Sequence, residues 1–277
     1  MGARIGKVTL RALAYVVLFL TKTKILRWPT VLNLVRYNSF AQKATLWVSV
    51  KRLQSFRRKN PTPSMSRIIL NSPRLKFHSL YSYNRLEHPT PCATELVKDL
   101  ASCVGLKNQK VLALGARNTI ELDQLVLYGA AEKDITAIDL YSSHPRILEM
   151  DFHNLQFSDA TFDIIFWAGS FAYAENPKKA AAEALRVLKP NGYLAVGDTL
   201  VGNAKKERLK GRIKNTKLEK QVSEALDTAA LATSLFTHQI DTIDNLVSYF
   251  YSDGDTLILT RIYEPTHANF VMKKNLS

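Results

Sequence analysis

Short apolar runs that end at a glycine or an acid recur between Val111 and Asp198, and they constrain the fold more than any other feature of the chain. The runs KVLAL, ITAI and FDIIFW are rich in Val, Ile and Phe, which is typical of strands buried on both faces of a sheet. Residues Pro177 to Leu188 have helical spacing, with Pro177 in the first turn and a stop and turn at Lys189 to Gly192. This alternation predicts an α/β fold: a mostly parallel sheet, helices on both faces, and ligands at the carboxyl ends of the strands.

Acids stand where the second and third of these strands are expected to end. Asp139 closes the run ITAI, and Asp151 begins a D-x-x-x-L-x-F-x-D-x-x-F-D pattern, which is followed further along by EALRVLKPNGYLAVGD. With these motifs in this order, residues 90–265 resemble the class I S-adenosylmethionine-dependent methyltransferases, in particular the small-molecule, methyltransferase-11-like branch. The resemblance implies a Rossmann-like, doubly wound sheet of seven strands whose last strand is antiparallel, and S-adenosylmethionine as the cofactor.

The resemblance also implies which residues contact the cofactor. In the family, the acid after the second strand accepts hydrogen bonds from both ribose hydroxyls, a role that falls to Asp139 with Leu140 beside it. The acid after the third strand receives the adenine amino group, and the next backbone N–H meets a ring nitrogen, which implies Asp151 and Phe152. Residues 186–192 match a turn that is structural in the family. A plainer interpretation of Asp139 is a helix N-cap, a common role for Asp.

The loop after the first strand departs from the family pattern of an acid followed by G-x-G-x-G. The acid position is Ala113, Gly115 is kept, and Arg117 and Thr119 replace the other two glycines, which narrows the loop and makes a positive φ costly. Two interpretations remain open. In one, Arg117 pairs with the cofactor carboxylate and Glu121 receives its ammonium group. In the other, the pocket no longer binds cofactor, Arg117 is a solvated cation and Glu121 is favoured only by the helix dipole.

The segment 167–177, WAGSFAYAENP, is expected to form one wall of the reaction pocket, beginning at Ala168. Ser170 and Tyr173 are the polar candidates to orient a methyl acceptor, although a packed aromatic ring is the commoner role of a tyrosine. His153 is a candidate base that fits a structural role equally well. Methyl transfer needs in-line approach, so positioning and desolvation can supply much of the rate without a dedicated base. The absence of N-P-P-Y and D-P-P-Y from this segment argues against methylation of exocyclic nitrogens of nucleic-acid bases, and the absence of cysteine argues against a covalent adduct at pyrimidine C5.

Charge is distributed very unevenly along the chain. Residues 1–86 hold 17 Lys and Arg and no Asp or Glu, whereas the remaining 191 residues hold 21 Lys and Arg against 24 acids, so the whole net charge of +14 comes from the amino-terminal part. An acid-free basic arm favours a polyanionic partner, which is a lipid surface, a nucleic acid or an organelle import receptor.

The first residues favour a membrane surface over the other two partners. Arg4, Lys7 and Arg11 fall on one helical stripe beside apolar residues, a pattern typical of a helix that lies in the membrane interface. The uncharged run 12–21 is too short to span a bilayer. We therefore predict peripheral attachment to an anionic membrane through residues 1–60. Import into a mitochondrion or another organelle, and a nucleic-acid-binding arm, remain the alternatives.

These features divide the chain into segments. They are a basic amphipathic, largely helical extension (1–56), a linker (57–66), a lid or wrap segment (67–90), the methyltransferase domain (91–265) and a C-terminal tail (266–277). The run 256–264 is predicted to be the last, antiparallel strand, preceded by a strand at 236–243 or at 246–252. A second basic cluster at 204–220 is either a solvated helix face or a sign of an anionic substrate. No Cys or His spacing indicates a metal site.

Three classes of function fit the sequence. The first, which we predict, is a membrane-associated methyltransferase that acts on a small-molecule, lipid or glycan acceptor. The second is an RNA methyltransferase whose basic arm binds RNA. The third is a non-catalytic Rossmann-like scaffold, which the altered glycine loop favours.

Overall fold

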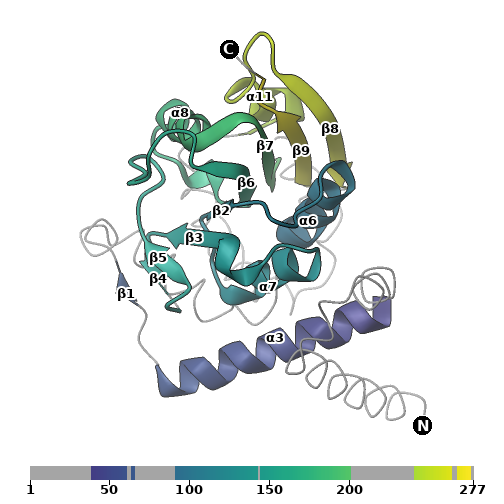
Figure 1. Cartoon of the computed structure of the whole chain (residues 1–277), viewed down its shortest axis with the longest axis vertical. Helices are drawn as coiled ribbons and strands as arrows, with labels where there is room; N and C mark the ends of the chain where they lie inside the picture. The colour runs from purple at the N-terminus through teal and green to yellow at the C-terminus, as the bar shows by residue number, and fades with distance from the viewer. Residues whose placement is uncertain are drawn as a thin grey trace, which may run out of the picture.

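The protein is built around one seven-stranded sheet, shown in the computed structural model in Figure 1. The structure describes residues 39–60, 64–65, 91–142, 144–200, 240–263 and 267–275. The strand order is β5-β3-β2-β6-β7-β9-β8. The strands are β2 (Val111–Leu114), β3 (Ile135–Asp139), β5 (Ile147–Glu149), β6 (Phe162–Ala168), β7 (Leu188–Thr199), β8 (Thr256–Tyr263) and β9 (His267–Lys273). All pairs from β5 to β7 are parallel, and β9 is antiparallel to both of its neighbours. The predicted Rossmann-like sheet with one antiparallel strand is confirmed.

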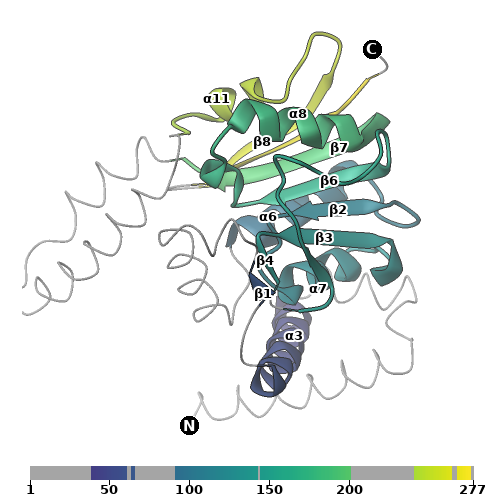
Figure 2. The same cartoon turned by 90° about the vertical axis from the view of Figure 1, so that its left-hand side faces the viewer.

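Helices cover both faces of the sheet, as the two views in Figures 1 and 2 show. Helices α6 (Pro91–Cys103) and α7 (Thr119–Leu127) share one core with Val111 and Ala113 of β2. Helices α8 (Pro177–Val187) and α11 (Ile243–Ser248) share the other core with Leu112 and Leu114. Successive side chains of a strand point to opposite faces, so a strand buried on both faces must be apolar throughout. This explains the continuous apolar runs of the sequence.

Helix α8 begins and ends where its sequence predicts. The Asn176 side chain caps it by accepting a 3.0 Å hydrogen bond from the Lys179 backbone N–H, and Pro177 occupies the first turn, where its missing N–H has no helical acceptor. The predicted turn after the helix forms the irregular start of β7. There Asn191 has a φ of 61°, and Gly192 O accepts from Lys274 N at 2.9 Å.

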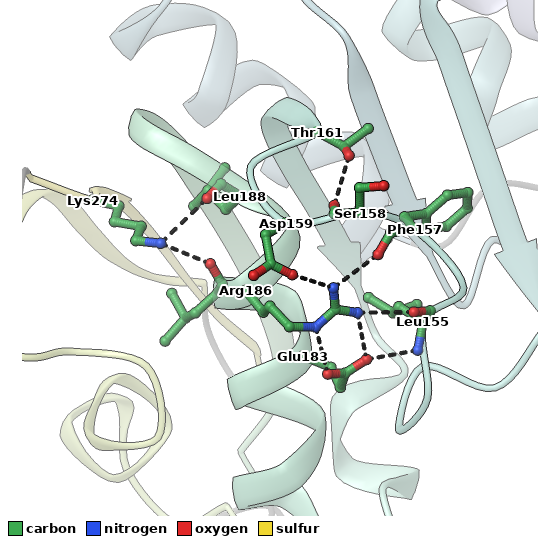
Figure 3. A network of polar contacts seen from close by, with 10 residues as sticks. Leu155, Phe157, Ser158, Asp159, Thr161, Glu183, Arg186, Leu188 and Lys274 are labelled. Carbon is green, nitrogen blue, oxygen red and sulfur yellow. Dashed lines mark hydrogen bonds and ion pairs between the residues drawn. The ribbon is translucent and has the colours of Figure 1, made fainter.

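The arginine of the LRVLKPNG motif anchors the loop that follows β5, as Figure 3 shows. Both Arg186 Nη atoms donate 2.8 Å bonds to backbone carbonyls of that loop, at Phe157 and Leu155, and Nε donates to Glu183 Oε1 at 2.8 Å. Glu183 Oε2 in turn accepts from Leu155 N at 2.8 Å, and Asp159 accepts from Nη1 at 2.7 Å. A guanidinium donates in a fixed, planar geometry, so it fixes the loop relative to α8. The role of Arg186 is structural.

The end of the chain differs from the prediction. Residues 256–264 were predicted to be the antiparallel strand, which is wrong, because β8 lies at the sheet edge and runs parallel to β7. The antiparallel strand is β9, within the predicted tail 266–277, and Asn269 interrupts its apolar pattern. Asn269 is fully buried, and its Nδ2 donates to Asp99 Oδ2 of α6 at 2.9 Å, so its amide donor has a tertiary partner.

The strand predicted before the last one is also corrected in part. Residues 243–248 form α11, which contradicts a strand at 246–252. Thr242 caps this helix by accepting from Asn245 N at 3.1 Å. The competing strand at 236–243 lies largely outside the described residues, as do the basic cluster at 204–220 and the wrap segment at 67–90.

The amino-terminal extension forms a third layer outside α7 (Figures 1 and 2). Helix α3 (Ser39–Lys59) continues through the first residues of the predicted linker, 57–66. Strand β1 (Ser64–Met65) then pairs with β4 (Tyr141–Ser142) in an antiparallel ribbon. The short helices η2 (Glu132–Asp134) and η3 (Phe171–Tyr173) complete the elements. Within the described parts of the chain, every helix is too short or too polar to cross a membrane.

Candidate cofactor site

The carboxyl ends of the parallel strands place most of the predicted site residues at one edge of the sheet. Gly115 directly follows β2, Asp139 is the last residue of β3, and Ser170 follows β6 by two residues. Asp151 follows β5 by two residues instead of closing it. Parallel strands that share this polarity bring their ends together, and an open α/β sheet binds its ligands there.

Gly115 is the one residue of the altered loop that must be glycine. Its φ is +63°, and a Cβ at this position would clash with Oγ and Cβ of Ser170. Ser170 Oγ is itself held in place, because it accepts a 2.8 Å hydrogen bond from Trp167 Nε1 and donates to Leu114 O at 3.4 Å. These contacts make Ser170 a support for the glycine loop.

Arg117 and Thr119 do not carry the backbone strain that the family pattern suggests for their positions. Among the described residues, the non-glycine positions with positive φ are Asn108, Ala160 and Asn191. The chain instead turns into α7 early: Asn118 adopts an extended φ of −159°, and its Oδ1 accepts from Ile120 N at 2.9 Å. The loop is therefore rebuilt as a short connection with an Asn cap, in which the second and third glycines are not needed.

Arg117 lies among acids that are costly to ionise. Glu121 is 4% exposed, and burial raises its pKa to about 7, with Arg117 opposing the rise and Asp139 adding to it. Burial likewise raises the pKa of Asp139 to about 7, against the effects of the Tyr141 and Leu140 backbone N–H groups and of Arg117. The Tyr141 hydroxyl donates to Arg117 O at 3.4 Å. The structure thus brings Arg117, Glu121 and Asp139 close enough to affect one another's charge.

Asp198 belongs to this edge, although the sequence analysis did not place it in the site. It is 1% exposed and accepts from Ala172 N at 2.9 Å and from Thr199 N at 2.7 Å. Burial raises its pKa to about 6, against these backbone donors. Burial also raises the pKa of Tyr173 to about 12, with Asp198 adding to the rise and Arg117 opposing it. Asp198 positions η3, which carries Tyr173. Its place at the end of an apolar strand, like that of Asp139, was the signal available in the sequence.

The adenine end is a separate, better solvated group. His153 Nδ1 contacts Asp151 Oδ1 at 2.7 Å, and His153 N donates to the same oxygen at 2.8 Å. Partial burial alone would raise the pKa of Asp151, but these hydrogen bonds outweigh it and hold the pKa below its usual range. His153 Nε2 accepts from Asn176 N at 3.2 Å. Both ring nitrogens of His153 are thus engaged within the protein, which fits the structural alternative better than a base.

The remaining predicted contacts line the same region. The Phe152 ring is 8% exposed and lies 5.0 Å from the Trp167 ring, centroid to centroid, so its side chain belongs to the core and its backbone remains for a ligand. Ala168 is buried at the end of β6, and Leu140 is partly exposed between Asp139 and Tyr141.

The site fits the charges and donors of S-adenosylmethionine. Glu121 is buried and Asp139 is partly exposed, and desolvation raises the pKa of each to about 7, so donors supplied by a ligand would favour their ionised forms. The cofactor carries an ammonium group and two ribose hydroxyls, which are such donors. Asn118 is 1% exposed, and its Nδ2 has no hydrogen-bond partner in the described structure, so the same loop also offers a buried donor to a carboxylate. Among the described residues, no group of three or more His, Cys, Asp or Glu side chains is placed to hold a metal ion.

Comparisons with known proteins give one family-model match and several distant structural similarities. Residues 99–196 match the family model of a methyltransferase domain. A SAM-dependent methyltransferase from Aquifex aeolicus is 17% identical and aligns over 70% of this chain and 97% of its own, with a TM-score of 0.44. A putative sarcosine dimethylglycine methyltransferase from Galdieria sulphuraria is 16% identical over 66% and 85%, with a TM-score of 0.46. A search of curated proteins found no match to the sequence.

The strand order and the match of residues 99–196 to a methyltransferase family model together identify a Rossmann-like methyltransferase domain within this chain. The protein is an enzyme that transfers a methyl group, and S-adenosylmethionine is its cofactor. Bound in this site, the cofactor supplies a methyl group on a sulfonium, which an acceptor must approach in line.

Proposed function

We propose that this methyltransferase works at an anionic membrane surface and methylates a small-molecule, lipid or glycan acceptor presented there. One observation carries the proposal: a cationic helix face lies next to the cofactor loops. Lys51, Arg52, Arg58 and Lys59 of α3 are exposed, and the sequence of the helix contains no acid. Each Lys or Arg near an anionic membrane contributes about 1 kcal/mol of attraction.

The opposite face of α3 explains why these cations point outward. Val50 and Leu53 are buried in one cluster with Ile120 of α7, and Leu46 is packed against it. A helix fixed by its apolar face presents its other face to solvent. Cations in the last turn also favour the helix C-terminus, which accounts for part of the charge at Arg58 and Lys59 but not for Lys51 and Arg52 in the middle of the helix.

Within the pocket, we assign the cofactor contacts residue by residue. Asp139 binds the ribose hydroxyls. Both contacts between His153 and the Asp151 carboxylate involve Oδ1, so Oδ2 is assigned to the adenine amino group. Glu121 receives the ammonium group of the methionine part, and Arg117 binds its carboxylate. Tyr173, held by the Asp198-anchored η3, is assigned to orient the acceptor.

Flotation with vesicles tests the surface. We expect the full chain to float with vesicles of phosphatidylcholine and phosphatidylserine, and not with phosphatidylcholine alone. The double variant Lys51→Gln with Arg52→Gln loses about 2 kcal/mol, so its partition coefficient falls about 30-fold. A matched control removes two exposed cations elsewhere, Lys107→Gln with Lys133→Gln, and keeps the partition of the parent chain.

Two outcomes contradict the proposal. If the chain does not float with the anionic vesicles at low salt, the proposed attachment to a membrane surface is excluded. If single-stranded RNA instead binds at concentrations at which vesicles do not, with a strong salt dependence, the cationic face serves an RNA acceptor.

A further inference from the structure

We infer that engagement of the cationic face of α3 by an anionic surface tightens cofactor binding, because the extension that bears this face rests on both cofactor loops. The inference rests on the proposed membrane function and adds its regulation. Two independent contacts carry it, one at each loop.

The first contact lies at the rebuilt glycine loop. The apolar face of α3 packs on Ile120, which is fully buried and whose backbone N–H is the one capped by Asn118. Ile120 is also the residue directly before Glu121. Leu53 and Val50 therefore pack against the first turn of α7 at Ile120. This residue orients both the Asn118 side chain, which accepts from its N–H, and the adjacent Glu121.

The second contact lies at the loop after β3. Strand β1 pairs with β4 in the register Ser64 with Ser142 and Met65 with Tyr141, two residues beyond Asp139. The Phe56 ring of α3 lies 4.3 Å from the His144 ring, centroid to centroid. Arg57 is close enough to Tyr141 to lower the pKa of its hydroxyl, whose principal shift is a rise caused by burial. The extension thus holds Tyr141, which donates to the backbone of Arg117.

The sign of the coupling follows from which face is free. With α3 in place, Leu53 and Val50 are buried against α7 while Lys51, Arg52, Arg58 and Lys59 stay exposed, so an anionic surface binds the docked extension. A partner that prefers one arrangement stabilises it, and whatever that arrangement orders binds more tightly. The opposite sign would hold if a membrane extracted α3 to bury its apolar face in lipid.

Calorimetry of S-adenosylhomocysteine with the full chain tests the coupling. We expect its Kd to fall about fivefold or more when the protein is saturated with phosphatidylserine-containing vesicles, compared with phosphatidylcholine vesicles. Because coupling is reciprocal, saturating S-adenosylhomocysteine must raise vesicle partition by the same factor. The reciprocal measurement uses the unmodified chain, so it does not depend on how any variant folds.

Leu53→Ala tests the route. This substitution removes most of the side chain that packs on Ile120 and keeps every cation. We therefore expect flotation to persist while the effect of the vesicles on the Kd of S-adenosylhomocysteine is lost. Its control, Leu257→Ala, alters an exposed leucine on the edge strand β8 and keeps the effect. Flotation with an unchanged or raised Kd overturns the inference and leaves the membrane function standing. Absence of flotation removes the membrane function first, and the two failures are thereby distinguished.

Discussion

The two ends of the proposed cofactor site differ in the environment of their acids. At the adenine end, Asp151 is partly exposed, bonded to His153 and held below its usual pKa. At the methionine end, Glu121 is buried, and burial raises its pKa to about 7. Asp151 is therefore ionised before a ligand binds, whereas Glu121 is expected to become fully ionised only when a ligand supplies a positive charge.

The difference shows how a glycine-rich loop can be replaced. Glycines bind a ligand through close approach of the backbone, whereas Arg117 and Glu121 bring opposite charges into a buried site, where they interact strongly. The loop tolerates the exchange because the positions of the two lost glycines do not have positive φ. Asp139 is partly exposed, but desolvation raises its pKa to about 7, as it does for Glu121.

The largest expected effect is at Asp139. In Asp139→Ala, two hydrogen bonds from ribose to a charged acceptor are lost, which weakens S-adenosylhomocysteine binding about 100-fold by calorimetry. Since ionising this acid is costly in the folded protein, the ligand-free variant is expected to melt at an equal or higher temperature at alkaline pH. An unchanged affinity of Asp139→Ala for S-adenosylhomocysteine would contradict the assignment of Asp139 to the ribose.

The next effect separates charge from loop geometry. Arg117→Gly restores the family's glycine, and we expect affinity to fall about 30-fold because a charged contact to the cofactor carboxylate is lost. Arg117→Lys keeps the positive charge but loses the planar guanidinium, so its affinity should lie between those of the parent protein and Arg117→Gly. Tighter binding by the glycine variant would mean that the native loop is strained and that the assignment of Arg117 is incorrect.

A smaller effect is expected at the adenine end. Asp151→Asn keeps the shape but replaces one carboxylate oxygen by a donor, and we expect about tenfold weaker binding. The pKa of Asp151 is lowered, so the carboxylate stays ionised at neutral pH and the loss should be the same at pH 6 and pH 8. A loss that varies with pH would show that the two ends are not distinct.

The smallest effect is the pH dependence of the parent protein. Glu121 and Asp139 have pKa values of about 7 without ligand, and the ligand's ammonium and hydroxyl groups favour their ionised forms, so binding lowers both values and releases protons. Affinity therefore rises with pH through the ligand-free pKa and levels off above it, about threefold from pH 7 to pH 8. Calorimetry in buffers of different ionisation enthalpy measures the released protons. Glu121→Gln should halve the dependence, and a parent protein without any dependence contradicts the assignment.

The sequence identified elements whose burial is uniform. The strand VLAL is apolar at every position because both of its faces are covered, and the helix after Asn176 has its cap, its proline and its amphipathic pattern in agreement. Strand β9 was missed because Asn269 breaks its apolar run, and the acceptor of the Asn269 Nδ2 hydrogen bond lies on α6, 170 residues away in sequence.

Site residues divide in the same way. Asp139 and Asp151 could be found from their places at strand ends, and Asp198 had the same signal without being assigned. The engagement of His153 Nε2 by the Asn176 backbone and of Ser170 Oγ by Trp167 could not be found, because each contact joins segments whose relative placement depends on packing.

By itself, the sequence determined the doubly wound fold and the concentration of positive charge in the first 86 residues, because strand burial, turn chemistry and charge are local properties of the chain. Only the tertiary structure decided that Arg117 and Glu121 share a buried site with Asp139, and that α3 rests on Ile120 with its cations outward. Burial is a property of what the rest of the chain places around a residue, and it gives Glu121 and Asp139 their raised pKa values.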